Sequence, residues 1–249
     1  MASATETVKN QQQYREKGWI RKTLGMPFSL LGVLLVSLLF SVVTEWIGLY
    51  FIWADEGWHH SRDMLNSELD WLSTSFKQSL LIQDPDHTVR KIIGLAYEWC
   101  FEKTGLIGWI TLSSEQARLN SVDSDGLQYF LGIAYMQIEN YGLAAVYAAL
   151  TFLARVLILT LSLPLFLMAT FTGLVDGLVR RDLRRFGAGR ESGFIYHRAK
   201  MLILPLLVLP WVIYPALPIT INPIMILLPS AAALGLVVSI SAGSFKKYL

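Results

Sequence analysis

The sequence predicts an all-α integral membrane protein with four transmembrane helices, both termini on the inner side (N-in, C-in) and a small helical acidic domain between the first two helices. Hydrophobic residues make up 53% of the 249 residues and charged residues only 16%, against roughly 25% charged in an average soluble domain. No Asp, Glu, Lys or Arg lies between Lys200 and Lys246. At about 1.5 Å per helical residue, this run can cross a hydrocarbon core of about 30 Å twice. Finally, basic residues gather in three segments that four crossings place on one side.

The first transmembrane helix is predicted over residues 27–53, after a basic cytoplasmic tail over residues 1–26. Pro27 begins an uncharged run that ends at Glu45, and four aromatic residues between positions 46 and 53 are typical of a membrane interface. No small-x-small cleavage site follows the run, so we expect an uncleaved anchor rather than a signal peptide.

An acidic, mostly helical domain is predicted over residues 54–142, which hold thirteen acidic residues against six Lys or Arg. Leucines at positions 65, 69 and 72 follow helical spacing. Asp84-Pro85 is typical of a helix start, and Asp125 with Gln128 resembles a capping box that begins another helix. The helix after Asp84 is expected to end at Gly105 and to carry on one side Val89, Ile92, Ile93, Ala96 and Cys100.

The rest of the chain alternates apolar spans with short polar segments. Arg155 interrupts the second span, and Pro164 is expected to kink it. The predicted boundaries are a second transmembrane helix over 143–176, a basic cytoplasmic loop over 177–200, a third helix over 201–217, a short outer turn over 218–223, and a fourth helix with a basic C-terminus over 224–249.

The orientation follows from the basic residues, because Lys and Arg in short loops near span ends stay on the cytoplasmic side. The N-terminal tail, the C-terminal Lys pair and residues 180–200, with seven Lys or Arg against two acidic residues, are basic. All three lie on one side if the chain crosses four times, and the acidic domain then lies on the other side.

Glu45 and Arg155 are the ionisable residues that border or interrupt the apolar runs. Counted from the inner ends of their spans, both lie near the outer leaflet, where a partner offsets the cost of burying either charge. Two alternatives remain open: an ion pair that joins the first two spans, or two separate side chains that reach the outer interface.

The sequence lacks the usual signals of catalysis. Neither a GxxxxGK[ST] nucleotide-binding loop nor a Gly-x-Ser-x-Gly elbow occurs. Glu56 with His60, or His59 with Asp63, offers only two ligands, whereas a zinc site needs three or four. The single cysteine, Cys100, excludes an intramolecular disulfide. We therefore expect no enzyme activity, no cofactor and no metal site.

The basic loop is a candidate contact surface because five arginines fall within eleven residues: Arg180, Arg181, Arg184, Arg185 and Arg190. If the second span continues as a helix past Asp176, positions 181, 184 and 185 share one face. Such a surface suits anionic lipid, an acidic face of a partner protein, or DNA phosphate, and these alternatives stay open.

Small residues spaced four apart let helices approach closely. Gly173 with Gly177, and Ala231 with Gly235, have this spacing and are candidate helix-packing positions. A homo-oligomer therefore stays open as well.

The segments GLVDGLVRRDLRRFGAGRES at 173–192, YHRAK at 196–200 and SFKKYL at 244–249 resemble the integrating conjugative element membrane proteins. The resemblance is close over residues 170–249 and compatible in layout elsewhere. It implies an inner-membrane component of conjugative DNA transfer through a type IV secretion system of an integrative element, beside the coupling ATPase. The chain is then a multi-pass protein of the bacterial inner (cytoplasmic) membrane, and its acidic domain is periplasmic. The resemblance brings no catalytic residues.

Three functions follow as hypotheses. The leading one is an accessory component of the conjugation machine, with Arg180, Arg181, Arg184 and Arg185 as its contact face. The second is a surface-exclusion or immunity protein that uses the outer domain. The third is a small membrane-perturbing pore, but a pore needs a polar stripe along a span, and these spans offer only scattered Ser and Thr.

The four-span topology predicts where a reporter enzyme that is active only in the periplasm will work. We expect activity when it is fused at residue 100, and none at residues 188 and 249, because the basic segments stay inside. Equal activity at residues 100 and 188 would contradict the four-span arrangement.

Overall fold

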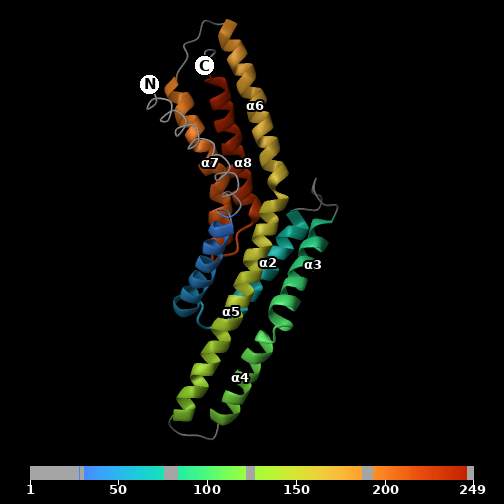
Figure 1. Cartoon of the computed structure of the whole chain (residues 1–249), viewed down its shortest axis with the longest axis vertical. Helices are drawn as coiled ribbons and strands as arrows, with labels where there is room; N and C mark the ends of the chain where they lie inside the picture. Colours follow the sequence, from blue (N-terminus) through green and yellow to red (C-terminus); the bar gives the residue numbers. More distant parts are fainter. Residues whose placement is uncertain (1–27, 29–30, 76–83, 122–126, 187–192, 246–249) are drawn as a thin grey trace, which may run out of the picture.

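The computed structural model describes residues 28, 31–75, 84–121, 127–186 and 193–245, and every regular element among them is a helix (Figure 1). The elements are an N-terminal helix (Leu31–Phe51), α2 (His59–Ser75), α3 (Pro85–Tyr97), a short π-helical segment η1 (Glu98–Glu102), α4 (Leu106–Ser121), α5 (Leu127–Leu161), α6 (Leu163–Phe186), α7 (Gly193–Ala216) and α8 (Pro223–Gly243).

The helices form two groups along the long axis of the molecule. In Figure 1, α6, α7 and α8 lie side by side at one end, while α2, α3 and α4 surround α5 at the other. The α5–α6 pair runs through both groups and joins them. One core of buried residues links the groups, from Leu72 and Val89 through Ile158 to Leu234.

The break between α5 and α6 falls at Ser162, two residues before Pro164. A proline in a helix cannot donate to the carbonyl four residues earlier, so a helix bends or breaks there. At this joint, Ser162 Oγ donates to the Leu159 carbonyl at 2.7 Å. The predicted kink at Pro164 therefore has its counterpart in this joint.

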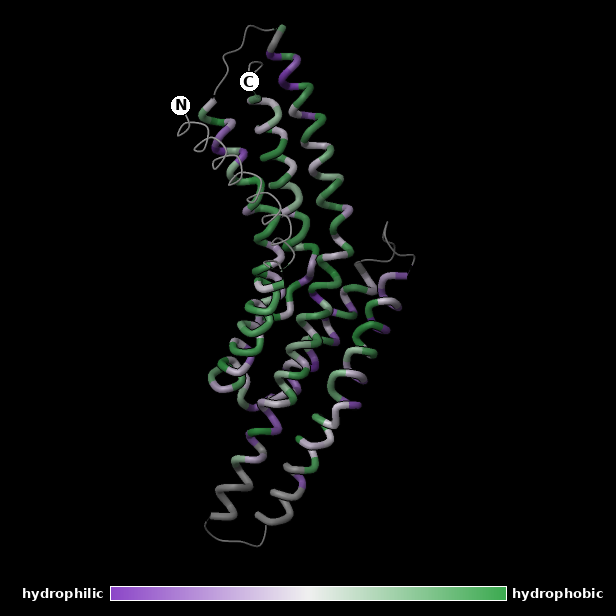
Figure 2. Tube along the Cα trace, viewed as in Figure 1, coloured by the Kyte–Doolittle hydropathy of each residue, from purple (hydrophilic) through white to green (hydrophobic). Residues whose placement is uncertain are grey.

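Four helices are long and apolar enough to cross a membrane: Leu31–Phe51, Gln137–Arg184, Gly193–Ala216 and Pro223–Gly243. This agrees with a multi-pass membrane protein. Figure 2 shows hydrophobic residues along α6, α7 and α8, with hydrophilic ones gathered at the end of α6. The second stretch, at 48 residues, is about 72 Å long at 1.5 Å per residue and exceeds one bilayer thickness. Its first part, from Leu143 to Leu161, is largely buried inside the protein.

The N-terminal helix is displaced along the long axis relative to α6–α8. Its second half packs on α5, where Trp46 Nε1 donates to the Tyr141 carbonyl at 3.0 Å. Near its start, Ser37 Oγ donates to the Val212 carbonyl near the end of α7, at 3.4 Å. The start of the first span therefore contacts the end of the third span, and the two helices are offset from each other along the long axis of the molecule.

The middle of the chain is helical as expected, with differences in detail. Leu65, Leu69 and Leu72 are buried, as are Val89 and Ile93.

Other features of this region differ from the sequence prediction. Ile92 is exposed within α3, and Cys100 is exposed in the π-helical turn at residues 98–102 that follows it. Gly105, at φ 72°, separates this turn from α4, a helix that the sequence analysis missed. Asp84 precedes α3 without a side-chain cap. No break occurs at position 142, where α5 continues through the predicted boundary, and the capping box at Asp125 lies outside the described residues.

The small residues proposed for helix packing lie mainly at the contact between α6 and α8, within one chain. A Cβ atom on Gly173 would lie 2.2 Å from the Gly235 carbonyl oxygen, and one on Gly177 would lie 2.5 Å from the Ser239 carbonyl oxygen. Ala231 is buried in the core one turn before Gly235. Glycine is required at this contact because the two backbones approach too closely for any side chain.

Replacing Gly173 by alanine therefore forces α6 away from α8. We expect a loss of stability of about 1–3 kcal/mol, the usual cost of overpacking, measured as thermal unfolding of the purified protein in mild detergent. Gly32→Ala is the matched control, because a Cβ at Gly32 meets no atom within 4 Å. Equal unfolding temperatures for the two variants would show that the close contact is not needed.

Candidate functional site

A cluster of buried polar side chains lies where α2, α5 and α7 meet, and we call it the polar junction. It consists of Glu68, Arg155 and Tyr214, and each of these residues is at most 1% exposed. Arg155 donates to Glu68 Oε1 from Nε at 2.9 Å and from Nη2 at 2.7 Å. The other carboxylate oxygen, Glu68 Oε2, accepts from the Tyr214 hydroxyl at 2.6 Å. The ion pair and the phenol therefore join three helices.

The same guanidinium also holds the connection between α7 and α8. Nη2 of Arg155 donates to the Ile219 carbonyl at 2.8 Å, and Nη1 donates to the Leu217 carbonyl. These carbonyls follow the end of α7, where helix carbonyls lack partners within the helix and the helix dipole favours a cation. The five N–H groups of an arginine fit this set of acceptors, whereas a lysine offers one point of attachment.

Of the two alternatives for Glu45 and Arg155, the ion pair between them does not form, because Arg155 binds Glu68 instead. Glu45 is 1% exposed and accepts a hydrogen bond from Ser61 Oγ at 2.6 Å. The alternative of two side chains reaching the outer interface is also wrong, since both are buried in protein.

Glu45 belongs to a buried polar stripe on the N-terminal helix. Ser37, Ser41 and Glu45 are spaced four apart and are at most 5% exposed, so they share the face that packs on the protein. The opposite face exposes apolar residues such as Leu35, at 56%, and Leu39, at 66%. This polar-inside arrangement is typical of a helix whose outer face contacts lipid.

Three polar atoms beside this stripe are buried without a hydrogen-bond partner among the described residues: Glu45 Oε2, Trp53 Nε1 and His60 Nε2. The Trp53 and His60 rings are stacked with centroids 4.0 Å apart, and Nδ1 of His60 is 3.1 Å from Glu56 Oε2. An unpartnered buried polar atom costs free energy, so this second cluster carries a desolvation cost that the hydrogen-bonded side chains of the polar junction do not.

The sequence analysis missed Glu68 and Tyr214. A signal for Glu68 was present, because it lies in the predicted leucine stripe, one position before Leu69 and four before Leu72. A carboxylate on an apolar helix face requires a buried partner. Tyr214 gave no such signal, since aromatic residues near span ends are common at membrane interfaces.

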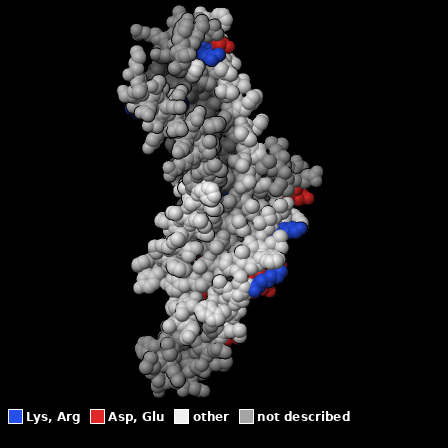
Figure 3. Space-filling model, viewed as in Figure 1, with Lys and Arg blue, Asp and Glu red and all other residues white. Residues whose placement is uncertain are grey.

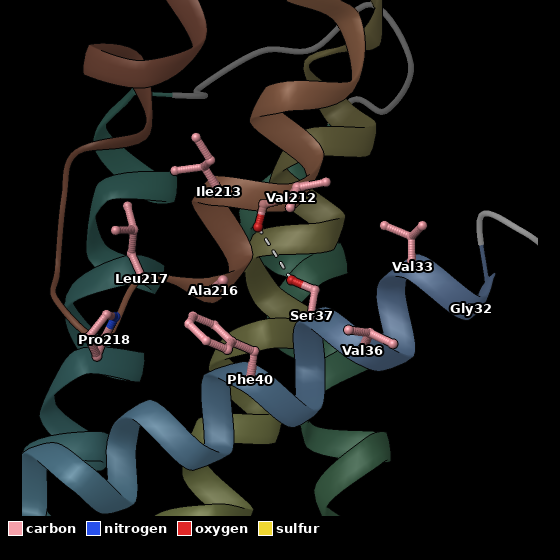
Figure 4. A pocket seen from close by; sticks show the side chains of 10 residues that line it. All are labelled: Gly32, Val33, Val36, Ser37, Phe40, Val212, Ile213, Ala216, Leu217 and Pro218. Atoms are coloured by element: carbon pink, nitrogen blue, oxygen red, sulfur yellow. Dashed lines mark hydrogen bonds between the residues drawn. The ribbon is translucent and has the colours of Figure 1, made fainter. Parts of the chain in front are cut away.

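An apolar crevice of about 710 Å³ opens between the start of the N-terminal helix and the end of α7 (Figure 4). Val33, Val36 and Phe40 form one wall, and Val212 and Ile213 belong to the other. The hydrogen bond from Ser37 to the Val212 carbonyl crosses between the two helices. None of the described residues that line the crevice is charged, which favours an apolar occupant.

The predicted arginine surface lies at the far end of α6. Arg180 is exposed and its Nε is 2.9 Å from Asp176 Oδ2, while Arg181 and Arg184 are half-buried. On the face that Figure 3 shows, charged side chains lie at this end and near α3, with an uncharged surface in between. Arg185 lies in α6, and Arg190 lies outside the described residues. Among the described residues, no His, Cys, Asp and Glu cluster could hold a metal.

The polar junction predicts strong coupling between Arg155 and Glu68. Either Arg155→Gln or Glu68→Gln leaves an unmatched buried charge, which costs about 3–5 kcal/mol. In a double-mutant cycle of unfolding in detergent, we expect the double variant to lose much less than the sum of the single losses. The matched cycle with Glu45→Gln should be closer to additive, and a larger coupling for Glu45 would refute the assignment.

Comparison with known proteins connects this helical architecture to a family. Searches against curated protein sequences and solved structures gave no match. The family described as IncC plasmid conjugative DNA transfer protein DtrJ-like matches residues 52–246. This range includes the polar junction, the α6–α8 contact and the arginines of α6. The chain therefore belongs to the DtrJ-like family of conjugative DNA transfer proteins.

Proposed function

We propose that the chain is an accessory inner-membrane component of a conjugative type IV secretion system, where it docks or supports the coupling ATPase. Membership of the DtrJ-like family supports a role in conjugative DNA transfer. The observation that carries the docking role is the row of arginines at the end of α6. Guanidinium groups bind carboxylates with two parallel hydrogen bonds, which suits an acidic face of a partner protein.

The anchoring of α6 supports this role, because a docking surface needs a fixed position. Asp176 Oδ2 accepts a hydrogen bond from Ser239 Oγ of α8 at 2.5 Å and binds Arg180 on the next turn of α6 at 2.9 Å. The close contact at Gly173 and Gly177 holds the same two helices together. The arginines therefore extend from a braced pair of helices.

The burial of the polar stripe argues against a pore made by one chain. Ser37, Ser41 and Glu45 supply the polar face that the sequence analysis looked for, but they pack against the protein. A conducting path requires polar side chains along an open lumen. A scaffold accounts better for this stripe, because its groups bond to neighbouring helices.

The partner can be identified by affinity purification of the tagged protein in mild detergent from donor cells that carry the whole conjugation module. We expect the coupling ATPase to co-purify. Recovery of the protein without the ATPase, under conditions that keep other inner-membrane complexes together, would contradict the docking role.

The role also predicts in which cell the protein acts. Deleting it from the donor should lower transfer, whereas expressing it alone in a recipient should leave transfer unchanged. A fall in transfer caused by expression in the recipient alone would favour the surface-exclusion function instead.

The docking role requires guanidinium groups, whereas membrane orientation needs only positive charge. Replacing Arg180, Arg181, Arg184 and Arg185 by lysine should therefore lower transfer from the donor by at least tenfold, equivalent to about 1.4 kcal/mol of lost contact. The measurement is conjugation frequency at matched abundance in the membrane fraction. Wild-type transfer at wild-type abundance would show that these arginines only orient the chain.

A further inference from the structure

A groove of about 310 Å³ lies among the ends of α6, α7 and α8 at the arginine-bearing end of the molecule. Both α6 and α7 pack extensively on α8, but they do not make a comparable contact with each other. The groove therefore has α6 and α7 as walls and α8 as floor. Its floor residues Val238 and Ser241 are at most 9% exposed.

The groove changes character along its length. Leu174 and Leu178 of α6 and Ile203 of α7 make its inner part apolar. Arg181 lines the same groove one turn beyond Leu178, and Tyr196 lies on the facing wall of α7. The guanidinium of Arg181 thus lies next to the apolar part of the groove, at the point where the apolar part of α6 ends.

Two cationic side chains, Arg181 and Lys200, lie at this end of the groove. Arg181 has a side chain that is 35% exposed, and it forms an ion pair with Asp182 in which Nε and Oδ1 are 3.8 Å apart, beyond hydrogen-bond distance. Lys200 adds a second positive charge, with Nζ 6.0 Å from the centre of the Tyr196 ring. Tyr196 in turn packs edge-on against Phe245, and both residues line the groove at its arginine-bearing end.

We propose that this groove binds an anionic phospholipid, with the headgroup phosphate at Arg181 and an acyl chain along Leu174, Leu178 and Ile203. The walls belong to helices that are long and apolar enough to span a membrane, and the predicted topology places this end of the groove beside the lipid headgroups. Basic pockets between transmembrane helices on the cytoplasmic side recognise anionic headgroups. A nucleic acid fits less well, because it has no apolar chain to place in the inner part.

The test is native mass spectrometry of the full-length protein in mild detergent, titrated with phosphatidylglycerol or with phosphatidylcholine of the same acyl chains. We expect the wild type to bind phosphatidylglycerol more tightly. Arg181→Gln should lower this preference by about fivefold, since one basic residue near an anionic surface contributes about 1 kcal/mol. Arg184→Gln, which removes the same charge one turn further along α6, should keep the preference because Arg184 does not line the groove.

A second variant tests the apolar part of the groove. Leu178→Trp fills the inner groove, so it should reduce the binding of phosphatidylglycerol by at least fivefold while the unfolding temperature stays near that of the wild type. The proposal fails if the wild type binds both lipids equally or if Arg184→Gln acts like Arg181→Gln. It also fails if glycerol phosphate alone displaces the lipid, because the site would then recognise a soluble phosphate.

Discussion

A guanidinium that is buried in protein must have acceptors for its N–H groups, and this requirement organises the middle of the molecule. Arg155 takes its acceptors from the Glu68 carboxylate on α2 and from carbonyls of the α7–α8 connection. Tyr214 completes the set by donating to the other carboxylate oxygen. Removing one member leaves another without a partner, so the interaction fixes the helices as a unit. The two helix groups of Figure 1 are therefore joined by charge as well as by apolar packing.

On the N-terminal helix, polar groups turn inward and apolar groups face outward. The serines and Glu45 of the N-terminal helix point into the protein. Beside the hydrogen bond from Ser239 to Asp176, α6 and α8 use glycine to bring their backbones together. Lipid tails give helices no hydrophobic reason to associate, so hydrogen bonds and close packing must hold them. The polar junction and the glycine contact are two solutions to the same problem.

The spans could be predicted from sequence because uncharged runs have one structural meaning at this length. The partner of Arg155 could not be predicted, since Glu68 lies 87 positions away in the sequence. Glu45 was the candidate because it was expected at a similar depth in the membrane. Helix α4 has weak apolar periodicity, so no pattern marked it. The offset of the N-terminal helix depends on contacts with α5 and α7, which local sequence does not encode. Local patterns thus predicted the elements, and long-range pairing decided the site.

Because α5 ends and α6 begins on either side of Ser162, a small change of angle there moves the far end of α6. At 24 residues, α6 is about 36 Å long, so a change of about 10° at the joint displaces its arginine-bearing end by about 6 Å, more than one helical turn. Because α8 is bound to α6 through Gly173, Gly177 and Asp176, the displacement carries both helices.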